Sequence, residues 1–540
     1  MSRLFIYTFF CLLISSQECV SQTYDWAWAR CAASTGNSPS SEGMQVATDS
    51  SENLYVAGFY GYNISFGPYV LSGAPNGSFL AVYDSNGNIK WAKGDSSINA
   101  SGGANTYGMC TDAYGNCYVS GGFLDTVYFD SIRLAGSRFG NAFLAKYDSS
   151  GNVLWAKSSS DTLEDYSWGV AVDVFGNSYI TGKYQTSVSF GPYTLSGSLY
   201  SNIFIVKYDP SGNVLWAKSS QGIGYNNLGT AVTTDLNGNI YLTGFFDSTS
   251  ISFGTQTIIN PNPHWYNAFL VKYDSSGNVI WATRPVGQGV NNEGWSVTCD
   301  LSGNIFLVGV TNYPNDGFIA KYDTSGNVIW SKSVTGSGGE VSCLEVTTDK
   351  TANLYVTGGF WSTPVNIGGD TTLQQGPLDS DPMFIVKYDS SGTLLFAKAL
   401  TNGGDDECGI AVTNSGSIYL GGDFTSNLFV LGNDALTYNG SGEQVFVAKL
   451  SYNNVLSDFS LINSVSDKPK IYPNPTSGHF SIYSDKITSI KIFNCLGETI
   501  YKEDNESYMQ KEVNIAANKG IYFIVVSDGE REYQQKLIIE

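Results

Sequence analysis

A repeated hairpin constrains the fold of this chain more than any other feature of its sequence. One copy, at residues 143–157, reads Phe-Leu-Ala-Lys-Tyr-Asp-Ser-Ser-Gly-Asn-Val-Leu-Trp-Ala-Lys. Related copies recur about every sixty residues, and their central column is Tyr83, Tyr147, Tyr208, Tyr273, Tyr322, Tyr388 and Leu450. Regular repetition of this length predicts a fold in which one supersecondary unit is used many times.

A second hairpin precedes each copy, and its turn follows the pattern Asp-x-x-Gly-Asn in most repeats. The predicted turns begin at Asp49, Asp112, Asp173, Asp235, Asp300, Asp349 and Asn414. This pattern is typical of a type I turn whose glycine is left-handed and closes a bulged hairpin, with the aspartate capping the turn. Two hairpins give four strands per repeat, so seven copies over residues 24–457 predict an all-β, seven-bladed β-propeller.

The two ends of the repeat region predict how the ring closes. The last copy loses its tryptophan strand after Leu450, whereas residues 26–30 (Trp-Ala-Trp-Ala-Arg) match the tryptophan strand with no hairpin before them. We therefore expect the N-terminal strand to complete the last blade and to remove two exposed sheet edges.

The hairpin register leads to predictions for the tryptophans and cysteines. It pairs Tyr147 with Val153 and Ala145 with Trp155, so each repeated tryptophan is expected to be a core residue that faces a small one. It also pairs Cys110 with Tyr118 and Cys117 with Thr111, on opposite faces, which excludes a bond between these two cysteines. Two other cysteines stand six positions before their turns in neighbouring blades and are the more plausible disulfide pair: Cys343 and Cys408.

Both termini differ from the repeats. Residues 1–21 have a basic start, an apolar run too short to span a bilayer and small residues near Ser21, and are predicted to be a signal peptide. Residues 458–469 form a polar linker, and the alternating segments of residues 470–540 predict a small C-terminal β-sandwich. We expect an exported chain with no membrane span.

Two resemblances accompany this organisation. The blade pattern is similar to the bacterial β-propeller repeat of secreted proteins, and the C-terminal segment resembles the type A sorting domain of the type IX secretion system of Bacteroidota. The matching motif positions in the tail are Tyr472, Pro473, Asn474, Pro475, Gly497, Gly520, Tyr522 and Lys536. The resemblance implies recognition by the type IX machinery, passage through the outer membrane, and removal of the tail on release or on anchoring to surface polysaccharide. The expected location is therefore secreted or on the outer cell surface.

Composition excludes several classes of function. The net charge of −20 disfavours nucleic acid as a partner, and two histidines in 540 residues disfavour histidine-based metal sites and Ser/His catalysis. The Asp-x-x-Gly-Asn turns lack the alternating carboxylates and closing glutamate of calcium loops. We therefore predict no cofactor, no metal and no enzymatic activity.

One set of positions varies between repeats in a way that suggests a ligand site. An acid or amide stands seven to nine positions before each turn: Glu42, Asn105, Asp165, Asn227, Glu293, Glu340 and Glu407. About two positions later come Met44, Tyr107, Trp168, Thr230, Trp295, Leu344 and Gly409. If the first strand of each blade is innermost, both sets surround one mouth of the central channel.

The mouth residues allow three interpretations. In the first, Tyr107, Trp168 and Trp295 stack on a sugar-like ligand beside Asp165 and Glu293, or the polar groups hold a hydrated cation. In the second, the acids cap each blade and the aromatic rings fill space. In the third, two of the carboxylates act as acid and base in a secreted polysaccharide-degrading enzyme. We favour a non-enzymatic binding or adhesion module whose partner is a glycan or a surface protein.

Overall fold

The computed structural model describes residues 23–35, 41–72, 77–97, 102–161, 163–285, 290–312, 316–337, 339–361, 364–373, 382–400, 408–425, 428–437, 443–453, 469–472, 476–494, 499–515, 519–527 and 532–539. The regular elements of these residues are all β-strands. The described part of the chain has no helix long and apolar enough to span a membrane. The chain divides into two compact units, Met1–Asn454 and Val455–Glu540.

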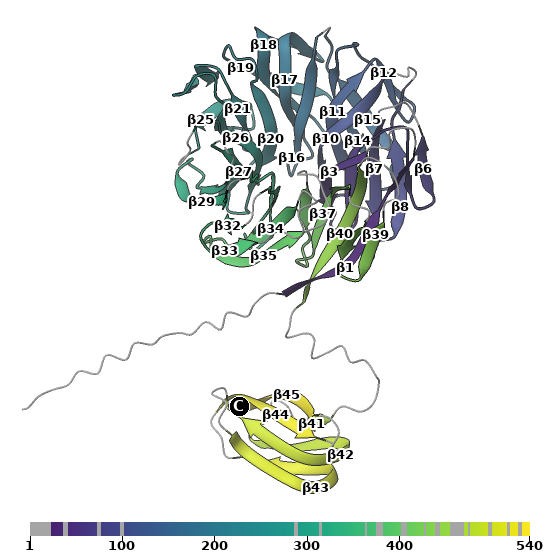
Figure 1. The fold of residues 1–540 in the computed structure, drawn as a ribbon, viewed down its shortest axis with the longest axis vertical. Helices are drawn as coiled ribbons and strands as arrows, with labels where there is room; N and C mark the ends of the chain where they lie inside the picture. The colour runs from purple at the N-terminus through teal and green to yellow at the C-terminus, as the bar shows by residue number, and fades with distance from the viewer. Residues whose placement is uncertain are drawn as a thin grey trace, which may run out of the picture. The chain divides into compact units, whose positions relative to one another are not determined.

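The larger unit consists of antiparallel four-stranded sheets that follow one another along the chain (Figure 1). The first three are β3 (Ser41–Thr48), β4 (Leu54–Tyr60), β7 (Gly77–Tyr83) and β8 (Ile89–Gly94); β10 (Gly103–Thr111), β11 (Cys117–Leu124), β14 (Asn141–Tyr147) and β15 (Val153–Ser158); and β16 (Asp165–Val172), β17 (Ser178–Phe190), β18 (Tyr193–Tyr208) and β19 (Val214–Gln221). The next three are β20 (Leu228–Thr234), β21 (Ile240–Phe246), β24 (Asn267–Tyr273) and β25 (Val279–Thr283); β26 (Glu293–Cys299), β27 (Ile305–Thr311), β28 (Asp316–Tyr322) and β29 (Val328–Gly336); and β30 (Glu345–Thr348), β31 (Leu354–Gly359), β34 (Met383–Tyr388) and β35 (Leu394–Leu400).

The remaining sheet of this unit joins the two ends of the repeat region. Its strand order is β36 (Gly409–Val412), β37 (Ile418–Phe424), β40 (Gln444–Asn453) and β1 (Thr23–Cys31). β1 runs antiparallel to β40, with Thr23 opposite Asn453 and Cys31 opposite Phe446. The N-terminal segment therefore supplies the outer strand of the last sheet.

The first strands of successive sheets contact one another in a cyclic order, β3, β10, β16, β20, β26, β30, β36 and back to β3. The sheets are arranged around these inner strands in a propeller-like manner (Figure 1). The apolar clusters lie between neighbouring sheets; one of them, for example, joins Leu80 and Trp91 of one sheet to Val119 and Phe143 of the next.

Short outer hairpins add pairing between neighbouring sheets. They are β5–β6 (Asn63–Phe66, Tyr69–Ser72) on β2 (Ala33–Thr35), β12–β13 (Thr126–Phe129, Ile132–Ala135) on β9 (Ser96–Ser97), β22–β23 (Ser250–Phe253, Gln256–Ile259) on β19, β32–β33 (Val365–Ile367, Thr371–Leu373) on β29, and β38–β39 (Leu428–Leu431, Asp434–Thr437). β22 and β32 form backbone hydrogen bonds with the last strand of the preceding sheet, which is β19 or β29. β5 and β12 instead pair with the short strands β2 and β9, each of which follows the last strand of the preceding sheet. These hairpins therefore help hold successive sheets together.

A repeated contact between sheets explains the tryptophan strands. Trp91 Nε1 donates a hydrogen bond to the carbonyl of Ser149 in the next sheet (3.2 Å), and its ring lies over Gly151. Gly151 has φ +84°, and a Cβ there would lie 3.0 Å from the Trp91 ring, so the position needs glycine on both grounds. Trp155, Trp216, Trp281 and Trp330 repeat the contact, and Trp28 of β1 makes it with Ser85 and Gly87.

The register of the tryptophan strand differs from the prediction by one residue. Tyr147 pairs with Val153 as expected, but Trp155 pairs with Lys146 because a bulge adds one residue to the outer strand. Lysine and tryptophan are thereby neighbours across the two strands. In the next copy, Lys207 Nζ and Trp216 Nε1 both donate to the carbonyl of Ser275. Trp91 and Trp155 are buried, and Trp216, Trp281 and Trp330 are partly buried.

Asp-x-x-Gly-Asn turns are capped by their aspartates, as predicted. In the turn at Asp148, the backbone N–H groups of Ser150 and Asn152 donate to Oδ1, and the Asn152 amide donates to Oδ2. One predicted boundary is wrong: the last inner turn begins at Thr413, whose N–H donates to the Ser417 carbonyl, and not at Asn414.

The shifted turn also removes the predicted disulfide. Cys343 lies six positions before its turn, but Cys408 lies only five before Thr413, so the two side chains are not at equivalent positions. Both cysteines are free and buried, in different apolar clusters. The predicted pairing of Cys110 with Tyr118 and of Thr111 with Cys117 is confirmed, and Cys110 and Cys117 are also free.

The smaller unit is one hydrogen-bonded sheet and not the two separate sheets of a simple sandwich. Its strands are β41 (Lys470–Tyr472), β42 (His479–Phe493), β43 (Thr499–Asn514), β44 (Gly520–Ser527) and β45 (Glu532–Ile539). β42 carries β43 along one edge, and on the other edge it pairs first with β41 and then with β44. Because β42 changes partners along its length, a single strand belongs to both halves of the sheet. An apolar cluster that includes Phe480, Ile492, Ile524 and Leu537 forms the core.

Candidate functional site: the central cavity

The inner strands enclose a cavity of ≈ 550 Å³. Residues from β3, β10, β16, β20, β26, β30 and β36 contribute to its wall. This volume falls within the range of roughly 300–1,000 Å³ that small-molecule sites occupy. The cavity is therefore large enough for a ligand of one or two sugar rings.

Three predicted aromatic residues line this cavity together: Tyr107, Trp168 and Trp295. They lie within β10, β16 and β26. Each stands at a bulge, where the ladder shifts between Thr106 and Gly108, between Ser167 and Gly169, and between Gly294 and Ser296. A bulge re-aims the side chain of its extra residue, which explains how these strands present large rings.

The aromatic rings are arranged unequally. Tyr107 and Trp168 stack with centroids 4.7 Å apart and planes 10° from parallel. Trp295 packs against Phe245 at 6.0 Å in a tilted geometry. The indole N–H of Trp168 is buried and has no hydrogen-bond partner among the described residues. The wall at Trp168 thus offers an apolar surface.

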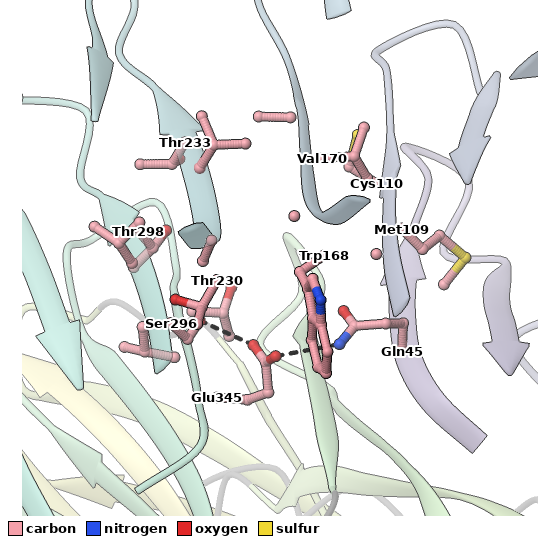
Figure 2. Close-up of a pocket in the computed structure, with 18 of the residues that line it drawn as sticks. Gln45, Met109, Cys110, Trp168, Val170, Thr230, Thr233, Ser296, Thr298 and Glu345 are labelled. Atoms are coloured by element: carbon pink, nitrogen blue, oxygen red, sulfur yellow. Dashed lines mark hydrogen bonds between the residues drawn. The ribbon is translucent and has the colours of Figure 1, made fainter. Parts of the chain in front are cut away.

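A polar group at the centre was missed by the sequence analysis. Gln45 Nε2 donates to Glu345 Oε1 at 3.2 Å, and Ser296 Oγ donates to Glu345 Oε2 at 2.9 Å (Figure 2). The three residues come from β3, β30 and β26, and all of them line the cavity. Burial raises the pKa of Glu345, while the hydrogen bonds from Gln45 and Ser296 act in the opposite direction.

A signal for this polar group was present in the sequence. All three residues stand four positions before their turn, where the other sheets have Gly108, Gly169, Ala231 and Gly409. The column therefore has glycine or alanine in four sheets and a polar residue in the other three. The aromatic residues Tyr107, Trp168 and Trp295 stand one position earlier in the same strands.

Asp165 is not among the residues that line the cavity, and its role beside a ligand stays a prediction. It is fully buried, where it accepts hydrogen bonds from Ser159 Oγ and from the backbone N–H of Ala142. Burial and the neighbouring carboxyl of Asp161 raise its pKa. Asp165 holds the start of β16 against the preceding sheet, which agrees with the capping interpretation.

Glu293 stands at the start of β26 and is partly buried. Burial, with the negative charge of Glu340, raises its pKa to about 7, and a hydrogen bond involving Trp295 opposes that shift. The interaction places Glu293 next to one of the cavity aromatics, although Glu293 itself does not line the cavity.

Among the remaining mouth positions, Thr230 and Leu344 line the cavity. Asn227 is buried and donates to the Ser201 carbonyl, so it supports the blade. Glu407 lies outside the described residues.

Raised carboxyl pKa values predict how stability depends on pH. Burial raises the pKa of Asp95 to about 6 and of Glu293 to about 7, and the pKa of Asp165 is raised as well. Between the ordinary carboxyl pKa and these values the folded state binds more protons than the unfolded state, so stability falls as pH rises. We expect the thermal midpoint to drop by several degrees between pH 5 and pH 8, measured by circular dichroism. Asp165→Asn should reduce that drop, and a midpoint that increases over this range would contradict the assignment.

The predicted sorting residues are only partly described. Tyr472 ends β41, Gly520 and Tyr522 stand at the start of β44, and Lys536 pairs with Phe523 within β45. The side chain of Tyr522 is buried. The other motif residues, Pro473, Asn474, Pro475 and Gly497, lie outside the described residues, as do residues 1–21 and residues 458–468 of the linker.

Comparison with known proteins supports the prediction for the tail. Residues 470–540 match the family described as "Secretion system C-terminal sorting domain". The match supports export of this chain as a type IX secretion substrate, and a secreted or cell-surface location agrees with it.

The chain also has a more distant relative. The chain is 28% identical over 309 residues to an uncharacterised WD repeat-containing protein of Acanthamoeba polyphaga mimivirus, an alignment that covers 54% of this chain and 19% of that protein. The chain thus spans about a fifth of the length of that relative.

Solved structures with a similar arrangement include a gluconolactonase from Xanthomonas campestris, with 10% identity, a TM-score of 0.29, and coverage of 62% of this chain and 90% of the other. They also include a mutant of the GH43 protein BlXynB from Bacillus licheniformis, with 10% identity, a TM-score of 0.26, and coverage of 68% and 85%. Similarity at this level carries no argument about activity or ligand.

Proposed function

We propose that this protein is a secreted or surface-anchored seven-bladed β-propeller, closed by β1, that binds a sugar-like ligand in its central cavity without catalysing a reaction. Its export would use the type IX pathway of Bacteroidota, directed by residues 470–540. The single observation that carries the binding proposal is the cavity itself, where Tyr107, Trp168 and Trp295 face the same space as Gln45, Ser296 and Glu345.

The chemistry of the wall suits a sugar. Aromatic rings contact the C–H face of a pyranose, while amide, hydroxyl and carboxylate groups accept or donate hydrogen bonds to its hydroxyls. These groups also depart from the repeat pattern, because other sheets have glycine or alanine where Gln45, Ser296 and Glu345 stand. Variation on a rigid scaffold is typical of a functional surface.

The tryptophan pair provides the test of this proposal. We expect the Trp168→Ala/Trp295→Ala double variant to lose at least about tenfold in affinity, because two apolar contact surfaces are removed and burial of apolar surface contributes roughly 25 cal/mol per Å². The measurement is a glycan array with the wild-type and variant mature chains, followed by calorimetric titration of the strongest glycan. Trp216→Ala is the matched control, since Trp216 holds two sheets together and does not line the cavity. Unchanged binding by a folded double variant would overturn the proposal.

One observation favours a second candidate, a secreted polysaccharide-degrading enzyme. The pKa of Glu293 is raised to about 7 by burial and by Glu340, as a general acid at neutral pH requires. The candidate needs a second carboxylate at a fixed separation across a bound glycosidic bond. Release of reducing sugar from array-positive glycans, abolished by Glu293→Gln, would favour the enzyme over the binding module.

A further inference from the structure

The carboxylate of Glu345 has no cationic partner in the cavity. Its two side-chain hydrogen-bond donors, Gln45 and Ser296, are both neutral. Among the described residues that line the cavity there is no lysine, arginine or histidine. A carboxyl group in such surroundings is stabilised either by protonation or by a cation, and an ammonium group in the cavity would stabilise its charged form.

Two of the repeated turn acids have a cationic neighbour. Asp112 and Asp173, at two inner turns, have the amino groups of Lys146 and Lys207 at 4.0 Å. The scaffold therefore places a lysine near its repeated acids. Glu345 is not a repeated acid, and its equivalents in the sheets of β10, β16 and β20 are Gly108, Gly169 and Ala231. Nothing in the blade pattern requires a carboxylate at this position.

The aromatic side of the same cavity favours a cation. Tyr107 and Trp168 form a parallel stack, and both line the cavity that Glu345 also lines. Aromatic faces attract organic cations through the ring quadrupole, and tryptophan does so most strongly. Figure 2 shows Glu345 and Trp168 facing the same space.

We propose that the ligand of this cavity is an amino sugar, whose protonated amine binds the Glu345 carboxylate and whose ring lies along Tyr107 and Trp168. This inference rests on the proposed function and adds the class of sugar. A primary ammonium supplies three hydrogen-bond donors, and a charge-assisted bond to a carboxylate is about twice as strong as a neutral one. Glucose lacks the ammonium, and N-acetylglucosamine replaces it with a neutral amide.

Three sugars and one substitution test the proposal. The full mature chain is titrated calorimetrically at pH 6 with glucosamine, N-acetylglucosamine and glucose. We expect glucosamine to bind at least tenfold more tightly than the other two. Glu345→Gln should remove this preference while keeping a cooperative thermal transition, because glutamine has the same shape and still accepts from Ser296. Glu164→Gln removes a carboxylate that pairs with Lys183 outside the cavity wall, and should leave the preference unchanged.

The outcomes separate this inference from the proposed function. Equal binding of the three sugars, or a preference that survives Glu345→Gln, overturns the amino-sugar assignment and leaves a sugar-binding cavity. If none of the three binds, the amino-sugar assignment is overturned, and the glycan array with the tryptophan variants decides the broader proposal. If Glu345→Gln does not fold, Glu345 is a structural residue and the assignment is also overturned.

Discussion

Deletion of residues 23–33 is expected to abolish cooperative folding of the larger unit. β1 is the outer strand of the last sheet, and its Trp28 ring covers Gly87 while its indole N–H donates to the Ser85 carbonyl. Tyr24 and Trp28 are both buried, and loss of two such aromatics costs on the order of 6 kcal/mol, which is comparable with the whole stability of roughly 5–15 kcal/mol. The deletion also exposes the edge of β40 to pairing with other chains. The measurement is a thermal scan with size-exclusion chromatography.

Deletion of residues 470–540 is the matched control, because it removes a separate compact unit and leaves β1 in place. That variant should keep the transition of the larger unit. A monomeric 23–33 deletion variant with the wild-type midpoint would contradict closure by β1.

The second large effect concerns export. Because residues 470–540 match a secretion sorting domain, their deletion should stop the protein from reaching the outer surface or the medium and leave it within the cell envelope. The quantity to measure is the fraction of the protein outside the cell, by immunoblot of medium, surface-digested cells and periplasm. We expect a loss of more than tenfold, with the propeller still folded.

Intact-mass analysis of the exported wild-type protein adds a control on processing. If the tail is a removed sorting signal, the exported chain should end within or near residues 458–469. Glu540 still attached to most of the exported protein would contradict removal of the tail, and export of the deletion variant at the wild-type level would contradict its role as the signal.

The repeated features were predictable because each copy of the motif gives the same local information. The capped turn at Asp148 and the pairing of Tyr147 with Val153 follow from turn chemistry that acts within a few residues. The pairing of Trp155 with Lys146 was missed because the bulge adds a residue beyond the turn, where the sequence pattern does not mark it. Likewise, the last inner turn begins with Thr413 in place of aspartate. Because Asn414 resembles the usual aspartate more closely, the predicted turn began one residue after the observed one.

The site was less predictable because it depends on contacts between distant repeats. The aromatic residues of the cavity could be predicted, because Trp168 and Trp295 stand where other repeats have smaller residues such as Thr230. The burial of Asp165 against Ser159 could not be predicted. An acidic residue at the start of a strand gives the same sequence pattern whether its side chain faces a ligand or the preceding sheet. The contact of Gln45 with Glu345 joins residues 300 positions apart, and only the ring arrangement brings them together.

The most direct test of the central claim is a crystal structure of the mature protein with the strongest glycan from the array. We predict that the sugar lies inside a seven-bladed ring, in the cavity between Trp168 and Glu345, with its ring against the aromatic stack. A sugar bound on the outer hairpins or on the smaller unit, with the central cavity filled only by water, would contradict the claim.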